Sequence, residues 1–150
     1  MKKLTLILFT LFAMGSMTAA HAQFAKAEDA IKYRKAAFTV MGTHFARIGA
    51  MVQGKAPFDA KLAAENAELV ASLSKLPWAA FGEGTDLGDT KAKSEVWKDQ
   101  AKFKAAAEKM QLEASKLAQA AQTGKEDAIK AAFSATGGSC KACHDDFRSK

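Results

Sequence analysis

The fold is decided by residues 126–147, which read EDAIKAAFSATGGSCKACHDDF. Apolar and small side chains recur in this stretch at steps of three and four residues, as on one face of an α-helix, whereas a strand would alternate at every second residue. The recurring positions are Ile129, Phe133, Thr136, Cys140, Cys143 and Phe147. We therefore expect a helix over about Glu126 to Phe147 that turns one face to a core.

The same stretch contains Cys140-Lys141-Ala142-Cys143-His144, which fits the C-x-x-C-H pattern of c-type haem attachment. Two thiols one helical turn apart can each add to a haem vinyl group, and the adjacent imidazole can reach the iron from the same side. The pattern predicts one haem c, bound covalently through Cys140 and Cys143, with His144 as the ligand of the iron.

Two other interpretations of the cysteine pair stay open. A redox-active C-x-x-C disulfide normally lies at a helix N-terminus after a strand, and no strand pattern precedes Ser139. A zinc site would need further Cys or His ligands, and apart from His144 the mature chain offers only His44. The pattern favours haem over both.

Gly137 and Gly138 lie just before the motif, although each costs a helix about 1 kcal/mol relative to Ala. Either a bulky planar ring lies against this turn of the helix, or the helix breaks there.

Three further helical segments are predicted upstream, over about Glu28–Val52, Asp59–Leu76 and Ser94–Gln122. They are rich in good helix formers, and a loop with three glycines, residues 78–89, joins the second to the third. Their apolar faces read Ile31, Arg34, Phe38, Met41, Phe45, Ile48 and Val52; then Leu62, Asn66, Leu69, Leu73 and Leu76; then Val96, Phe103, Met110 and Leu117. We expect an all-α antiparallel four-helix bundle with one haem c in its core.

Arg34 is the one charged member of the first apolar face. A buried charge is costly unless it is paired. Its guanidinium could grip a haem propionate in bidentate fashion, or it could lie at the end of the bundle and extend to solvent. The sequence leaves these two interpretations equal.

Residues 1–22 have the features of a secretory signal: Lys2 and Lys3, an apolar run, and the small residues of an A-x-A site at Ala20 to Ala22. The run is roughly half the ~20 residues that span a bilayer. We expect cleavage after residue 22, a periplasmic mature protein with no membrane partner, and one domain over residues 23–150.

The formal charge is +6 at pH 7, from 22 Lys and Arg against 16 Asp and Glu. Basic and acidic residues are interspersed, so no basic stripe is present and nucleic acid is not an expected partner. A mildly basic surface could meet an acidic redox partner protein.

The mature chain resembles the cytochrome c prime family, the class II c-type cytochromes. The likeness rests on QFAK at residues 23–26, the pair Tyr33-Arg34, LPWAAFG at residues 76–82 and SCKACHD at residues 139–145. It covers essentially the whole mature chain. The resemblance implies a left-handed antiparallel four-helix bundle, usually a homodimer, whose iron is five-coordinate and high-spin.

The resemblance also implies roles for five side chains. Phe38 matches the apolar residue that closes the far face of the haem. Arg34 and Asp89 match positions near the propionates, and Arg148 matches a basic residue beside the proximal imidazole. Lys35 stands where many members carry Gln, next to the Arg.

Pocket chemistry and the resemblance together predict a protein that binds NO and CO, in NO sequestration or buffering. An apolar pocket has no hydrogen-bond donor for bound dioxygen, which favours these two gases. We do not expect an enzymatic activity such as that of a peroxidase, because no distal His and Arg pair is evident. The alternative is a periplasmic single-electron carrier whose low-spin haem takes Met41 as sixth ligand. For the homodimer we expect contacts through Ala30, Ala37, Val40 and Val70.

Overall fold

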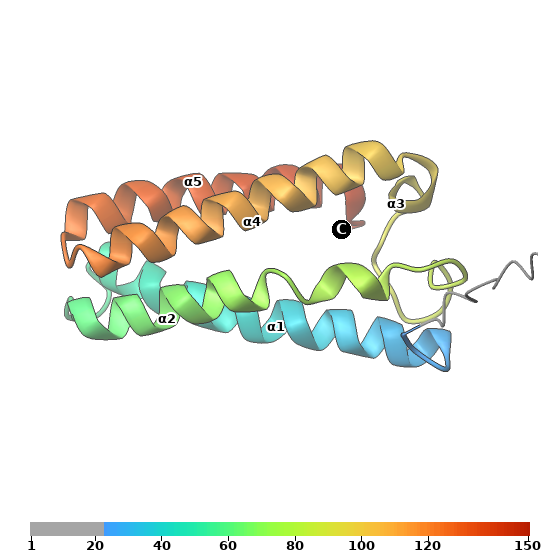
Figure 1. The fold of residues 1–150 in the computed structure, drawn as a ribbon, viewed down its shortest axis with the longest axis horizontal. Coiled ribbons are helices and arrows are strands. Elements are labelled where there is room, and N and C mark those ends of the chain that lie inside the picture. The colour runs from blue at the N-terminus through green and yellow to red at the C-terminus, as the bar shows by residue number, and fades with distance from the viewer. Residues whose placement is uncertain (1–22) are drawn as a thin grey trace, which may run out of the picture.

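A computed structural model describes residues 23–150, and the expected signal peptide, residues 1–22, lies outside them. The elements in chain order are α1 (Ala27–Val52), α2 (Ala60–Leu73), a short 3-10 helix η1 (Pro77–Ala80), α3 (Glu95–Lys98), α4 (Gln100–Gln122) and α5 (Glu126–Phe147). The four long helices form two antiparallel pairs, α1 with α2 and α4 with α5 (Figure 1). The predicted antiparallel four-helix bundle is confirmed. Among the described helices, none is both long and apolar enough to cross a membrane.

The four long helices do not pack equally tightly against their neighbours around the bundle. Close packing joins α1 to α2, α2 to α4 and α4 to α5, whereas α1 and α5 approach each other at few places. Where they do meet, the rings of Phe45 and Phe133 stack. The bundle therefore has three tight seams and one loose seam, between its first and last helices.

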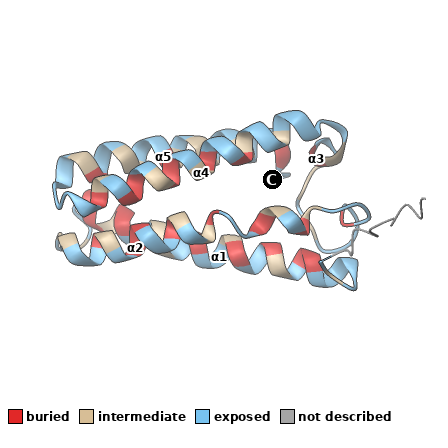
Figure 2. Ribbon diagram, viewed as in Figure 1, coloured by how far each residue is buried: buried red, intermediate tan, exposed pale blue. Residues whose placement is uncertain are grey.

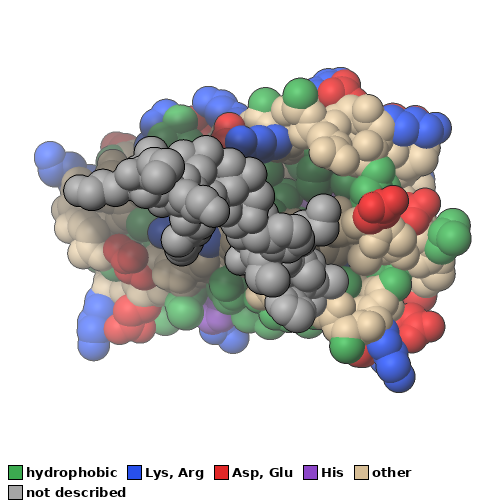
Figure 3. Space-filling model, turned by 45° about the vertical axis from the view of Figure 1, so that its right-hand side comes forward, with side chains coloured by type: hydrophobic (Ala, Val, Ile, Leu, Met, Phe, Trp, Pro, Cys, Tyr) green, Lys and Arg blue, Asp and Glu red, His purple; other side chains and the backbone are tan. Residues whose placement is uncertain are grey.

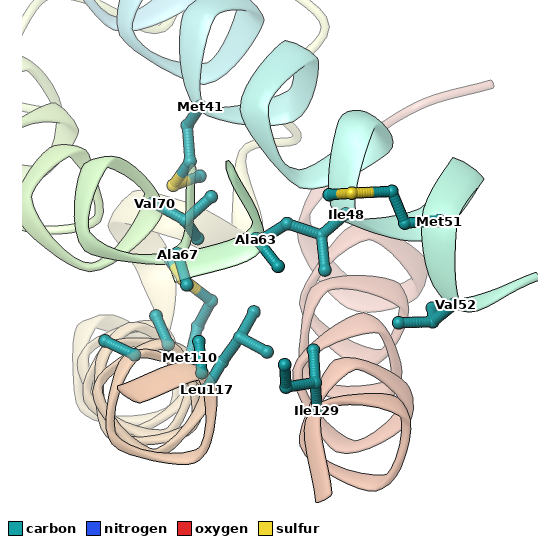
Figure 4. Close-up of a cluster of buried hydrophobic side chains, with 13 residues drawn as sticks. Met41, Ile48, Met51, Val52, Ala63, Ala67, Val70, Met110, Leu117 and Ile129 are labelled. Atoms are coloured by element: carbon teal, nitrogen blue, oxygen red, sulfur yellow. The ribbon is translucent and has the colours of Figure 1, made fainter. Parts of the chain in front are cut away.

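The buried side chains lie on the inner faces of the helices (Figure 2). Figure 4 shows them converging from all four long helices, with Ile48 from α1, Leu117 from α4 and Ile129 from α5 at the centre. Alanines make up much of the rest of this cluster, which lets the helices approach closely. The cluster leaves the bundle end that carries α3 free for the site described below.

The predicted inner face of α2 is wrong in part. Leu62, Leu69 and Leu76 are 44%, 43% and 43% exposed, whereas Ala63 and Ala67 are fully buried. Asn66, the one member of the predicted face that is buried, points between α2 and α1, where it meets His44. The cause is steric, because alanine lets α2 pack against both α1 and α4, and a leucine in its place would hold the helices apart.

The single helix expected over Ser94–Gln122 is two helices. The chain leaves helical geometry at Asp99, with φ −120° and ψ 63°, and the carboxylate there accepts the N–H of Lys102 at 3.1 Å. Asp99 thus caps α4, the role that Asp favours over a mid-helix place. The second predicted helix also ends early, at Leu73, before η1.

Candidate cofactor site

A cavity of 630 Å³ opens along the loose seam, at the end of the bundle near α3. Its walls come from α1, α5, the start of α4, and the connection between η1 and α3. Figure 3, in which this end comes forward, shows hydrophobic side chains set back in a hollow of the uncovered surface. The volume falls within the roughly 300–1,000 Å³ typical of small-molecule and cofactor sites.

Cys140, Cys143 and His144 all line the cavity from the last turns of α5. The helix runs unbroken through Gly137 and Gly138, so the alternative in which it breaks there is wrong. Because three residues make nearly one helical turn, the two half-buried thiols share a face. They are free and not joined in a disulfide.

Burial controls the chemistry of both thiols. It raises the pKa of Cys140, and it raises that of Cys143 to about 11, with the neighbouring Cys140 and Asp146 adding to the effect. Thiols of this kind stay protonated at neutral pH. They lack the lowered pKa that activates the C-x-x-C pair of a disulfide oxidoreductase.

His144 is exposed at its position in the cavity wall. Desolvation lowers the pKa of its imidazole, and the positive charge of Arg148 lowers it further. Both effects favour the neutral imidazole, in which a ring nitrogen retains the lone pair that a metal would take.

The wall opposite the motif is aromatic. Phe38, half-buried on α1, meets Trp78 edge-on with ring centroids 5.8 Å apart, and it meets Phe81 at 6.4 Å. Phe103 packs against Trp78 and against Phe147. The contacts with Trp78 and Phe81 fix the orientation of the Phe38 ring at the cavity surface.

Met41 also lines the cavity, one turn beyond Phe38, but it is only 7% exposed. Figure 4 shows its side chain directed toward Val70 in the buried cluster. Its contacts are those of a core methionine that fills an irregular gap.

Arg34 is 2% exposed, so the interpretation in which it extends to solvent is wrong. Its Nη1 donates to the carbonyl of Ala80 and to the hydroxyl of Thr85, each at 2.9 Å. Its Nη2 donates to the Thr85 carbonyl and to the hydroxyl of Thr90, each at 2.7 Å. The guanidinium also lies over the Phe81 ring, 4.4 Å from its centroid. Protein groups thus compensate the buried charge.

The other predicted side chains gather at the rim of the cavity. Lys35 on α1 forms an ion pair with Asp89 at 2.5 Å, and both residues line the opening. Arg148, just past α5, also lines it. The structure therefore brings all eight predicted site residues to one cavity.

The sequence did not identify Thr85 and Thr90 as partners of Arg34. They lie in the glycine-containing connection, more than fifty residues along the chain from Arg34. No local spacing rule links positions so far apart, and threonines in a loop resemble ordinary turn residues. Only the folded chain shows the pairing.

A planar apolar cofactor fits this cavity. Its wall is aromatic and aliphatic, two protonated thiols stand on one face of α5, and a neutral imidazole follows them. Basic side chains are confined to the rim and to Arg34. These are the features that a haem with an apolar body and anionic propionates requires.

Fold and site together define the class of four-helix-bundle proteins with a C-x-x-C-H motif on the last helix. A family model described as Cytochrome C' matches residues 29–148. The chain belongs to the cytochrome c' family.

Individual relatives agree with this assignment. The cytochrome c' of Rubrivivax gelatinosus is 58% identical over 129 residues, which are 85% of this chain and 100% of the relative. Its crystal structure has a TM-score of 0.82 over the same shares of the two chains. A nitric oxide complex of a mutant of the Alcaligenes xylosoxidans protein has a TM-score of 0.81 at 48% identity, covering 85% of this chain and 99% of the other. A carbon monoxide-bound variant of that protein has a TM-score of 0.80 at 48% identity, covering 85% and 100%.

Proposed function

We propose that residues 23–150 form a periplasmic protein that holds one haem c and binds NO and CO, with NO sequestration or buffering as its role. Cys140 and Cys143 attach the haem, and His144 ligates its iron. The observation that carries the proposal is the convergence of this motif with Phe38 from the opposite helix on one apolar cavity. The NO and CO complexes of the Alcaligenes protein support the choice of gases.

The haem would supply an iron atom with one position open to a diatomic ligand. Phe38 limits access to that position, because a phenyl ring cannot coordinate iron and its aromatic neighbours restrict its movement. Three threonines line the cavity. The hydroxyl of Thr39 donates to the carbonyl of Lys35, that of Thr136 donates to the carbonyls of Ala132 and Glu113, and that of Thr90 accepts from Arg34 and from the N–H of Ala92. The hydroxyls of Thr39 and Thr136 are therefore not available as donors to bound dioxygen, which favours NO and CO.

At the rim, we propose that Arg34, Lys35 and Asp89 surround the propionates and that Arg148 lies beside the imidazole of His144. Lys35 can exchange its ion pair with Asp89 for a propionate oxygen without crossing an apolar region, since both groups are exposed. Arg34 can offer a propionate a bidentate contact only if it releases bonds to Thr85 or Thr90.

The role is binding rather than catalysis, and the test is one optical spectrum. Purified ferric and ferrous protein should show a high-spin haem, and the ferrous spectrum should change on adding NO. A low-spin spectrum with a methionine-to-iron charge-transfer band would instead favour the single-electron carrier with Met41 as ligand and an acidic redox partner protein. The burial of Met41 among core side chains favours the gas-binding role.

We propose that the protein is a homodimer, but the expected contact residues need correction. Ala30, Ala37 and Val70 are 2%, 8% and 2% exposed within one chain, so they cannot form an interface. Val40 is 46% exposed on α1, and Leu62 and Leu69 are exposed on α2. We propose that these three side chains contribute to a shared patch through which two copies pair about a two-fold axis.

A further inference from the structure

A chain of hydrogen bonds crosses the open end of the bundle from α1 to the residue after α5. Arg34 donates from Nη2 to the Oγ1 of Thr90 at 2.7 Å, and the backbone N–H of Ala92 donates to the same oxygen at 3.1 Å. Ala92 in turn pairs with Arg148 in a short antiparallel bridge. The loose seam between α1 and α5 is therefore bridged here.

The bridge ties residues 91–93, which we call the strap, to the C-terminal residues on both sides of Arg148. The N–H of Lys93 donates to the carbonyl of Phe147 at 2.9 Å, and the N–H of Ser149 donates to the carbonyl of Lys91 at 2.8 Å. Phe147 is buried, so this end of α5 is anchored in the core as well. The strap thus holds a fixed segment of the chain and not a loose terminus.

The two ends of this chain of bonds, Arg34 and Arg148, each lie one helical turn from a residue of the site. Phe38 lies one helical turn after Arg34 on α1, and His144 lies one turn before Arg148, whose N–H donates to the His144 carbonyl at 3.0 Å. The bonds from Arg34 to Arg148 therefore run beside the space between Phe38 and His144. A change in the separation of Arg34 and Arg148 should therefore move Phe38 and His144 relative to each other as well.

The side chain of Thr90 joins the two parts of this chain of bonds. Its oxygen accepts both the guanidinium N–H and the Ala92 N–H. The first bond is charge-assisted, which makes it stronger than a bond between neutral groups. The Arg34 guanidinium is fixed by three other bonds, so Thr90 connects the strap to a rigid point of α1.

We propose that Thr90 is a positioning residue of the haem site: through the strap, it fixes the separation between Phe38 on α1 and His144 on the last turn of α5. The inference rests on the proposed function, because that separation is the space that NO or CO would enter. Thr90 touches neither gas nor iron in this role.

The test replaces Thr90 by Val, which keeps the shape and removes the acceptor. Hydrogen exchange of the Lys93 and Ser149 amides, measured by NMR on haem-loaded protein, should become roughly tenfold faster, the change that one hydrogen bond to a charged group brings. CO association with the ferrous protein should become faster as well. Thr90→Ser, which keeps the hydroxyl, should restore both rates.

Thr85→Val is the matched control. It removes a hydroxyl that also accepts from Arg34, at 2.9 Å, but that has no bond to the strap. We expect it to leave exchange at Lys93 and Ser149 and CO association unchanged. Equal effects of Thr85→Val and Thr90→Val on these rates would overturn the proposal, because the hydroxyl of Thr90 would then only stabilise Arg34.

A second variant acts from the other side of the bridge. Ser149→Pro, at an exposed position near the end of the chain, removes the N–H that bonds to Lys91 and should speed Lys93 exchange and CO association. Ser149→Ala keeps this N–H and removes only the second donor to the same carbonyl, the hydroxyl at 3.1 Å, so it should change both rates less than Ser149→Pro does. Unchanged exchange in both Thr90→Val and Ser149→Pro overturns the strap, whereas wild-type protein without covalent haem overturns the proposed function instead.

Discussion

The rings of Phe45 on α1 and Phe133 on α5 stack with their centroids 4.2 Å apart and their planes 14° from parallel. Phe45 also lines the cavity, so this stack closes its inner end at the loose seam. A Cβ placed on Gly49 would lie 2.8 Å from the Cζ of Phe133. The two helices meet here because one of them offers glycine at the point of contact.

Gly49→Ala should therefore destabilise the protein, although alanine is the better helix former by about 1 kcal/mol. The overlap with the Phe133 ring costs about 1–3 kcal/mol, as in other overpacked cores. Denaturant unfolding would measure the net loss. In the Phe133→Leu background, where the ring is gone, Gly49→Ala should no longer be destabilising, and additive effects of the two substitutions would contradict the contact.

Covalent haem attachment should depend on both thiols of the motif. We expect acidified acetone to leave the haem on the wild-type chain, and Cys140→Ala with Cys143→Ala to yield a chain without covalent haem. Each single variant should retain one thioether bond, which mass spectrometry of the denatured chain would detect. Complete extraction from the wild type would refute the assigned role of the motif.

Phe38→Ala should speed CO binding to the ferrous protein and raise its affinity, because the main effect of the ring is steric. The change should cost less than the about 3–5 kcal/mol that removing a fully buried Phe costs, since Phe38 is half-buried. Stopped-flow mixing of folded protein with CO would give the rates.

Met41→Ala is the companion variant, because Met41 is the rival for the same face. We expect it to lower stability and to leave the high-spin spectrum unchanged. The gas-binding role fails if Phe38→Ala leaves CO kinetics unaltered while Met41→Ala converts a low-spin wild type to high spin.

Glu113 should make stability depend on pH. It is buried on α4, and its Oε1 accepts from Lys109 at 2.7 Å and from Lys116 at 3.0 Å, which lowers its pKa below the ordinary 4.5. A lowered folded-state pKa means that the stabilisation is present above pH 4.5 and is lost as the pH falls through the folded value.

Glu113→Gln should therefore be less stable than the wild type at pH 7, with a difference that shrinks toward low pH. Urea unfolding at several pH values would show it. Glu108→Gln is the control, because Glu108 is exposed and lies 3.8 Å from Lys104, a pair of little expected value. A constant difference between Glu113→Gln and wild type across the pH range would contradict the ion-pair explanation.

Leu69→Lys should weaken the homodimer by placing two like charges in the shared patch. Sedimentation at tens of micromolar, where a Kd of about 1 μM gives mostly dimer, would show a shift toward monomer. Leu112→Lys is the control, because Leu112 is 51% exposed on α4, outside the patch. Equal behaviour of the two variants would place the interface elsewhere.

The parts of the fold that local chemistry determines could be predicted. The bounds of α1 and α5 agree with expectation to within one residue, because each is bordered by a glycine that adopts positive φ, Gly54 after α1 and Gly124 before α5. The C-x-x-C-H motif could be predicted for the same reason, because Cys140, Cys143 and His144 are close together in the sequence.

Features set by tertiary contact could not be predicted. Hydrophobicity alone selects Leu62 and Leu69 for the inner face of α2, but the close approach of neighbouring helices selects Ala63 and Ala67. The hydrogen bonds that hold Arg34 likewise depend on Thr85 and Thr90, two loop residues that lie far along the chain. Side-chain size at a helix contact and long-range hydrogen bonds become known only when the neighbours are known.

The two walls of the cavity come from opposite ends of the chain, Phe38 from the first helix and His144 from the last. Chains are synthesised from the N-terminus and their structure begins to form in that order. When the N-terminal part of the chain emerges first, α1 can pair with α2 before Cys140 and Cys143 are available. The cavity therefore exists only in finished chains, and a chain truncated before the motif offers the cofactor no attachment point.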